Sequence, residues 1–181
     1  MDFYTYDGNT LLRSIIRAIV YIVVLISLAW FLVYGFMGQT IISGQSMSPL
    51  LNAEDVCLVN RLAYDLGNPG RYDVVLFERT DSSKLNVKRI IGLPGDTVQI
   101  IDKVVYVNGE PVEDERYQSV SLAGIAENIV ELGKDEYFLL GDNTDSSEDS
   151  RFSNIGNVQR RNIKGKLWMK IRPVSDISFL R

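Results

Sequence analysis

A stretch without charged side chains, residues 18–37, constrains this chain more than any other feature of its sequence. At about 1.5 Å per residue, a helix of about 20 residues is about 30 Å long, which matches the hydrocarbon core of a bilayer. A cleaved signal peptide has a shorter apolar core, of about 7–15 residues, followed by a small-x-small site. A helix buried in a soluble protein would show a polar face over this length. The stretch therefore predicts a permanent transmembrane helix.

Basic residues are distributed unevenly around this predicted helix. Arg13 and Arg17 precede it, and the next basic residue along the chain is Arg61. Because positive charge is retained on the cytoplasmic side, residues 1–17 are expected in the cytoplasm and residues 38–181 on the outer face. The pattern predicts a single-pass protein of the plasma membrane.

The part after the helix is long enough for one domain with its own hydrophobic core. The chain has 181 residues and a net charge of −4, which leaves no basic footprint for nucleic acid. Its single cysteine, Cys57, lies in an apolar segment and is expected to be a core thiol. The sequence contains no histidine and no cysteine cluster, so a structural zinc site is not expected.

Short apolar segments separated by glycine and proline dominate this domain. We expect strands at residues 55–59, 73–77, 85–93, 97–101, 104–107, 136–140 and 163–171. The polar residues 112–133 are expected to form an irregular excursion or a small extra subdomain. Many short strands predict a mainly β domain, an antiparallel sheet or barrel, rather than βαβ units.

Ser46 lies at the start of the predicted domain, and taken alone it would be an ordinary turn residue. A serine nucleophile usually relies on a histidine base, and this chain has none. Lysine is the best remaining base if desolvation keeps its amine neutral. Lys88 lies in an apolar strand, where alternation places it and Arg89 on opposite faces. We expect only one of the two to point inward, and the alternative for Lys88 is a surface lysine.

The acidic segment at residues 140–151 raises the alternative of a calcium site. An EF-hand loop that starts at Asp142 needs glycine at its sixth position and glutamate at its twelfth. Those positions hold Ser147 and Ser153. We therefore expect a turn-rich loop whose carboxylates accept backbone hydrogen bonds, and no bound metal.

Four segments behind the N-terminal anchor resemble the sequence boxes of bacterial type I signal peptidases, in the same order. They are residues 44–50 (GQSMSPL), 71–75 (RYDVV), 88–96 (KRIIGLPGD) and 141–151 (GDNTDSSEDSR). With the anchor, the resemblance extends over nearly the whole chain.

This resemblance implies a role for each matching residue. Ser46 corresponds to the nucleophile and Lys88 to the general base. Ser147 corresponds to a serine that positions the lysine amine. Asp149 and Arg151 correspond to an ion pair that braces the site, and Arg89 to a structural basic residue.

The resemblance also implies an antiparallel β fold, in which the substrate adds as an extra strand beside the residues that lead into Ser46. Small apolar pockets would receive the substrate residues one and three before the cut, which explains a preference for Ala-x-Ala. The lining residues would be Ile42, Leu51, Leu76 and Val87. The expected partners are membrane lipid and the signal peptides of preproteins that emerge from the export machinery, with no cofactor and no nucleic acid.

The chain departs from the family at a few positions. Gly44 stands where some members carry a serine whose hydroxyl helps to bind the oxyanion, so the second oxyanion donor is left open. Tyr72 replaces the usual glycine, and Thr144 replaces a frequent arginine. Three alternatives remain. A repressor-type self-cleaving peptidase would lack the anchor, and a catalytically silent assembly factor for surface proteins would be expected to lack the serine or the lysine. The third is an anchored β domain that only binds a partner.

Overall fold

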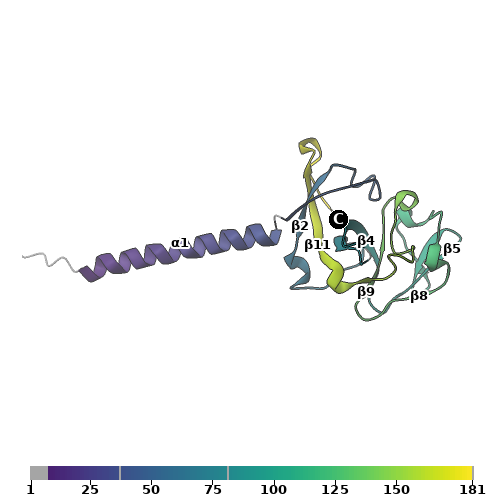
Figure 1. The fold of residues 1–181 in the computed structure, drawn as a ribbon, viewed down its shortest axis with the longest axis horizontal. Helices are drawn as coiled ribbons and strands as arrows, with labels where there is room; N and C mark the ends of the chain where they lie inside the picture. Colours follow the sequence, from purple (N-terminus) through teal and green to yellow (C-terminus); the bar gives the residue numbers. More distant parts are fainter. Residues whose placement is uncertain (1–7, 37, 81, 181) are drawn as a thin grey trace, which may run out of the picture.

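A long N-terminal helix is joined to a β-rich domain (Figure 1). The computed structural model describes residues 8–36, 38–80 and 82–180. Helix α1 (Gly8–Phe36) is continuous over 29 residues. Its segment Thr10–Tyr34 has a mean hydropathy of 2.5 and none of it is buried against the domain. Because an apolar surface of this length is stable in lipid rather than in water, the helix anchors the protein in a membrane.

The helix begins earlier than the predicted span. Arg13 and Arg17 lie on the same helix as the apolar residues, close to its start, rather than in a separate segment before it. Residue 37, the last of the predicted span, and residues 1–7 of the predicted cytoplasmic segment lie outside the described residues.

Two antiparallel sheets form the domain, as the strand pattern predicted. In the described part of the chain, the larger sheet has eight strands in the order β1-β2-β11-β3-β4-β9-β10, with β12 beside β11. Their bounds are β1 (Gly38–Ile41), β2 (Val56–Asn60), β3 (Val74–Glu78), β4 (Leu85–Gly92), β9 (Glu136–Leu140), β10 (Val158–Gln159), β11 (Ile163–Arg172) and β12 (Ser178–Phe179). The smaller sheet follows the order β7-β6-β5-β8. It contains β5 (Thr97–Ile101), β6 (Val104–Val107), β7 (Glu110–Pro111) and β8 (Val130–Glu131).

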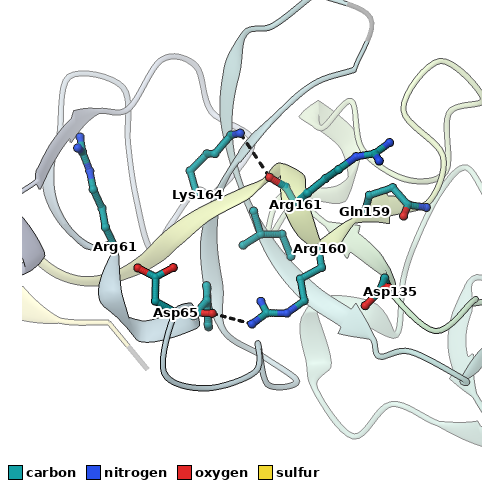
Figure 2. Close-up of a pocket in the computed structure, with 9 residues that line it drawn as sticks. Arg61, Asp65, Asp135, Gln159, Arg160, Arg161 and Lys164 are labelled. Atoms are coloured by element: carbon teal, nitrogen blue, oxygen red, sulfur yellow. Dashed lines mark hydrogen bonds between the residues drawn. The ribbon is translucent and has the colours of Figure 1, made fainter.

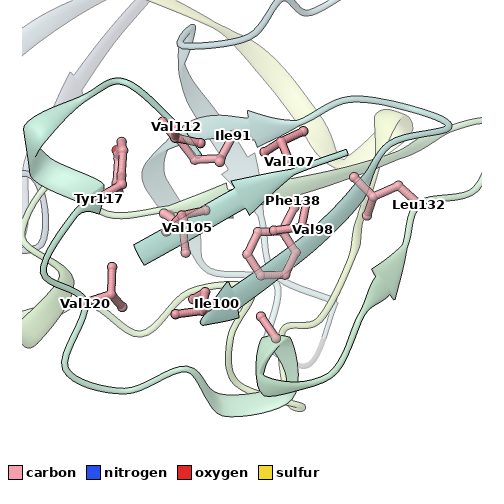
Figure 3. Close-up of a cluster of buried hydrophobic side chains, with 12 residues drawn as sticks. Ile91, Val98, Ile100, Val105, Val107, Val112, Tyr117, Val120, Leu132 and Phe138 are labelled. Carbon is pink, nitrogen blue, oxygen red and sulfur yellow. The ribbon is translucent and has the colours of Figure 1, made fainter. Parts of the chain in front are cut away.

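The smaller sheet packs against one end of β4 and β9 through a shared core (Figure 3). Ile91 and Phe138 come from the larger sheet, and Val98 and Val105 from the smaller one. Contact at this junction is close: a Cβ atom at Gly92 would lie 2.5 Å from Leu132 and 2.8 Å from Val98. The junction therefore requires glycine, and the two sheets form one packed unit.

The excursion predicted at residues 112–133 is mostly irregular. It contains two short 3-10 helices, η2 (Glu115–Tyr117) and η3 (Gly124–Glu127), and it ends with β8. The sequence pattern missed β1, β7, β8, β10 and β12. The last four have only two residues each, too few to show alternation, and β1 (GQTI) contains a single large apolar residue, Ile41.

One expectation about β4 was wrong. Lys88 is 3% exposed and Arg89 is 0% exposed, so both side chains are buried. The reason is that β4 is covered on both faces. Ile90 belongs to one apolar cluster, and its neighbour Ile91 belongs to the cluster shared with the smaller sheet.

Candidate active site

Ser46 lies in a series of turns that follows β1 at the edge of the larger sheet. Gly44 has a φ of +93°, a backbone conformation that favours glycine. Met47 and Leu51 are fully buried and anchor the turn in the core, and the amide of Leu51 donates to the carbonyl of Met47 at 2.8 Å. The buried anchors leave Ser46 partly exposed beside them.

The acidic loop after β9 contacts the backbone of Ser46. The amide of Asn143 donates to the Ser46 carbonyl at 3.0 Å. A Cβ atom at Gly141 would lie 2.5 Å from that carbonyl oxygen and 2.3 Å from Ser147 Oγ. Glycine at this position therefore allows the main chain of Ser46 and the hydroxyl of Ser147 to approach the same point.

Lys88 lies on β4 opposite Val75 of β3, with its side chain buried. Burial lowers the pKa of its amine from 10.5 to about 8. The next largest influence is the attraction of Asp149, which acts in the opposite direction and raises this pKa. Within the described ranges no carboxylate lies close enough to form a salt bridge with this amine. Roughly one amine in ten is therefore neutral at pH 7, compared with about one in 3,000 for an unperturbed lysine.

The resting structure holds no hydrogen bond between Ser46 and Lys88 among its described residues. Catalytic hydrogen bonds are often long before substrate binds and tighten in the complex. Ser46 and Val87, the residue that precedes Lys88 on β4, line the same cavity.

A buried chain of polar contacts supports this region. Ser147 Oγ donates to Asp149 Oδ2 at 2.6 Å, and the amide of Gly141 donates to the same oxygen at 3.1 Å. Asp149 and Arg151 form an ion pair of 2.8 Å, and both side chains are at most 1% exposed. Arg151 compensates much of the negative charge of Asp149. Asp149 therefore attracts the ammonium form of Lys88 less strongly than an unpaired carboxylate would.

Asp142, which the sequence pattern had suggested only as the start of a loop, is the centre of a second buried network. Arg89 donates two hydrogen bonds to it, at 2.8 and 2.7 Å, and Arg116 Nη1 donates at 2.6 Å. The hydroxyl of Tyr117 also donates to it, at 3.0 Å. Burial and the adjacent carboxylate raise the pKa of Tyr117. Sequence reasoning missed Arg116 and Tyr117, because nothing in a polar excursion marks which side chains turn inward.

Arg151 also joins the acidic loop to the excursion at residues 112–133. Its guanidinium donates to the carbonyls of Leu122 at 3.0 Å and Thr144 at 2.6 Å. Its own carbonyl accepts from the amide of Ile125 at 2.9 Å. The carboxylates of the loop are thus bound mainly by arginine, tyrosine and serine side chains, rather than by the backbone amides expected from sequence. The described residues hold no group of acidic or thiol side chains arranged for a metal ion.

A narrow cavity of about 20 Å³ adjoins Ser46, and its lining includes Ile42, Met47 and Val87. Two of the four predicted pocket residues, Ile42 and Val87, therefore reach it. The other two, Leu51 and Leu76, are 0% and 7% exposed and belong to the core cluster behind it. A space of this volume holds a group about the size of a water molecule.

Two unpaired strand edges border this cavity. β1 pairs with β2 alone, which leaves its other edge open among the described strands. In β4, residues 85–88 pair with β3, whereas pairing with β9 starts at Arg89. Because Thr40, Ile41 and Asn86 all line the cavity, the two open edges face it from both sides.

Comparison with known proteins points to one family. The model of the family described as signal peptidase, peptidase S26, matches residues 12–171. A probable signal peptidase I-2 of Synechocystis sp. is 35% identical over 145 residues, which cover 77% of this chain and 65% of that protein, just under two thirds of its length. Signal peptidase I of Leptolyngbya laminosa is 35% identical over 77% of this chain and 70% of the relative. Signal peptidase I of Bacillus caldolyticus is 34% identical over 77% of this chain and 81% of that relative.

Proposed function

This chain belongs to the signal peptidase family, peptidase S26, and we propose that Ser46 and Lys88 carry out its cleavage of signal peptides from preproteins. The observation that supports this most strongly is Lys88, a buried amine with a pKa of about 8, in a chain without histidine. An amine that is partly neutral at physiological pH is what a serine nucleophile needs as its base.

In the acylation step, Lys88 Nζ takes the proton of Ser46 Oγ as that oxygen attacks the scissile carbonyl. The resulting ammonium gives the proton to the leaving amino group, which releases the mature protein. The same amine then deprotonates a water molecule that hydrolyses the ester and frees the signal peptide. The backbone N–H of Ser46 is a donor for the oxyanion. Gly44 has no hydroxyl, so it adds no second side-chain donor.

Ser147 is proposed to orient the amine of Lys88. Its hydroxyl proton is already donated to Asp149. The oxygen therefore keeps its lone pairs for a hydrogen bond from the lysine, while Arg151 holds Asp149 in place. Arg89 and Asp142 fix the base of the acidic loop from the opposite face of β4.

The substrate is proposed to bind as an extended strand between the open edges of β1 and β4. Backbone hydrogen bonds to both edges would hold it without regard to sequence. The cavity of about 20 Å³ then selects for a small side chain, since it admits a methyl group and rejects larger residues. Ala-x-Ala sites meet this requirement.

The anchor is proposed to span the plasma membrane with its N-terminus in the cytoplasm. Arg13 and Arg17 lie near the start of α1. Trp30 and Tyr34 stack at 5.4 Å near its other end, where aromatic rings favour the interface. The catalytic domain would then lie on the outer face, where exported preproteins arrive.

Incubation of the purified full chain with a preprotein that carries an Ala-x-Ala site tests the proposal. We expect two products cut after the second alanine, and a preprotein with Trp in place of that alanine should remain intact. If the Ala-x-Ala preprotein also stays intact in membrane-like detergent, the proposed activity is refuted, and the tethered assembly factor becomes the better interpretation.

We expect the pH dependence of cleavage to follow the pKa of Lys88. Only the neutral amine is active, so kcat/KM should rise about tenfold from pH 7 to a plateau above pH 9, with its midpoint near the pKa of about 8. Initial rates with a short Ala-x-Ala peptide between pH 6 and 10 measure it. A constant kcat/KM over that range would rule out lysine as the base.

Gly141→Ala should reduce cleavage by about 100-fold or more. The added methyl would lie 2.3 Å from Ser147 Oγ and 2.5 Å from the Ser46 carbonyl oxygen, so at least one of them must move. Overpacking of this kind lowers the free energy of unfolding by about 1–3 kcal/mol. The matched control is Gly70→Ala, where the nearest atom to the new methyl is 3.6 Å away, and it should keep normal activity. Equal activity in the two variants would contradict this reading of the site.

A further inference from the structure

A basic pocket lies beside the end of β2, distinct from the cavity at Ser46 (Figure 2). Its volume is about 490 Å³. The charged side chains in its lining are four basic and two acidic, namely Arg61, Arg160, Arg161 and Lys164, with Asp65 and Asp135. This excess of positive charge occurs in a chain whose net charge is −4.

The arginines of this pocket differ from most others in the domain, because they lack carboxylate partners. Across the described ranges, Arg61, Arg160 and Arg161 form no salt bridge. Five arginines elsewhere do, in the pairs Arg71–Asp96, Arg79–Glu148, Arg89–Asp142, Arg116–Asp114 and Arg151–Asp149. Asp65 and Asp135 offset part of the positive charge of the pocket, but neither forms a salt bridge with its arginines in the described part of the chain.

Arg160 extends into the pocket and is held there by the backbone. Its Nη2 atom donates to the carbonyls of Tyr64 at 2.6 Å and Gly67 at 2.8 Å, which orient the guanidinium but leave its charge uncompensated. Lys164 is less available, because it pairs with Glu78 at 2.7 Å. The side chain of Arg61 has no hydrogen bond among the described residues, and that of Arg161 has none either.

The pocket lies close to the membrane end of the domain. α1 ends at Phe36, and Gly38 pairs with Val59 of β2. A Cβ atom at Gly38 would lie 3.0 Å from Nε of Arg61, so this guanidinium approaches the chain just after the helix. The headgroup layer on each side of a bilayer is about 5–8 Å thick. Because the apolar part of α1 reaches to its end, Arg61 lies at about the depth of the lipid headgroups.

We propose that the basic side chains around this pocket bind the phosphates of anionic phospholipid headgroups in the leaflet from which the domain emerges. The guanidinium groups of Arg61 and Arg161 point to different sides of the pocket, so each would contact its own headgroup (Figure 2). A guanidinium binds phosphate oxygens through pairs of parallel hydrogen bonds. Basic residues next to a transmembrane helix attract anionic lipid by about 1 kcal/mol each, which is about fivefold in affinity. The bound headgroups would fix the height and rotation of the domain over the bilayer, and hence the position of Ser46 relative to a membrane-bound signal peptide.

Spin-labelled lipids can test this with the full chain reconstituted in phosphatidylcholine bilayers. The measurement is the fraction of spin-labelled phosphatidylglycerol that the protein immobilises, relative to spin-labelled phosphatidylcholine. The test variant is Arg61→Gln with Arg161→Gln, because neither side chain forms a hydrogen bond or a salt bridge among the described residues. The matched control is Lys103→Gln with Arg172→Gln, which removes two exposed charges elsewhere in the domain.

We expect the wild-type chain to prefer phosphatidylglycerol, and the test variant to lose about fivefold to 25-fold of that preference. The control variant should keep it, and 1 M salt should weaken it in the wild-type chain. An equal loss in both variants, or no preference in the wild-type chain, overturns the proposal. Cleavage of a short soluble peptide is measured in parallel. It should be the same in all three proteins, and since it depends on Ser46 and Lys88 alone, its outcome separates failure of the lipid site from failure of the proposed catalytic function.

Discussion

Ser46→Ala should abolish cleavage of an Ala-x-Ala preprotein while the domain stays folded. Loss of a serine nucleophile removes the covalent step, and activity should fall by more than about 10³-fold. The side chain of Ser46 makes no hydrogen bond among the described residues, so the free energy of unfolding should change by less than about 0.5 kcal/mol. Product formation is followed on a gel over hours, and folding by circular dichroism.

The matched control for this variant is Ser153→Ala. Ser153 is exposed and lies beyond the acidic loop, away from the contacts of Ser46, so its variant should cleave at the normal rate. Normal cleavage by Ser46→Ala would refute the assignment of the nucleophile, since another group would then have to attack the scissile carbonyl.

Lys88→Met should abolish cleavage and also make the domain more stable. The folded-state pKa of about 8 lies below the unfolded value of 10.5, so folding is penalised wherever the amine is protonated in both states. The penalty is up to about 3 kcal/mol below pH 8, shrinks between pH 8 and 10.5, and vanishes above. Methionine has a similar length and no charge, and it removes the penalty.

Chemical unfolding of the two proteins at pH 7 and pH 10.5 measures this effect. The variant should exceed the parent chain by about 3 kcal/mol at pH 7, and the difference should largely disappear at pH 10.5. Lys84→Met is the control, because Lys84 is exposed and should change neither stability nor activity. A variant that is inactive yet less stable at pH 7 would mean that Lys88 is held by favourable contacts rather than by forced desolvation.

Much of the architecture could be predicted because its signals are local. The uncharged run in α1 is continuous, and strands such as β3, β5 and β9 are apolar segments bounded by glycine, proline or aspartate. The confirmed mainly β fold follows from that pattern. The short edge strands gave no such signal, although β1 supplies one of the two open edges at the cavity.

The candidate site was only partly predictable. The order of the sequence boxes pointed to Ser46, Lys88 and the acidic loop, but not to the residues that hold the loop in place. Arg116 and Tyr117 reach Asp142 from an excursion without periodicity, and Arg151 reaches back to Leu122. Such contacts join residues that are distant in sequence and depend on how the smaller sheet packs on the larger one.

By itself, the sequence determined that the chain has a membrane helix, a β domain and the chemical groups for a serine–lysine reaction, because residue type and order specify these. The tertiary structure decided that Lys88 and Arg89 are both buried, since only packing on both faces of β4 can enclose two neighbouring cations. That enclosure removes water from one amine and lowers its pKa to about 8. Desolvation depends on the whole surrounding fold, and it cannot be assigned to any one segment of the chain.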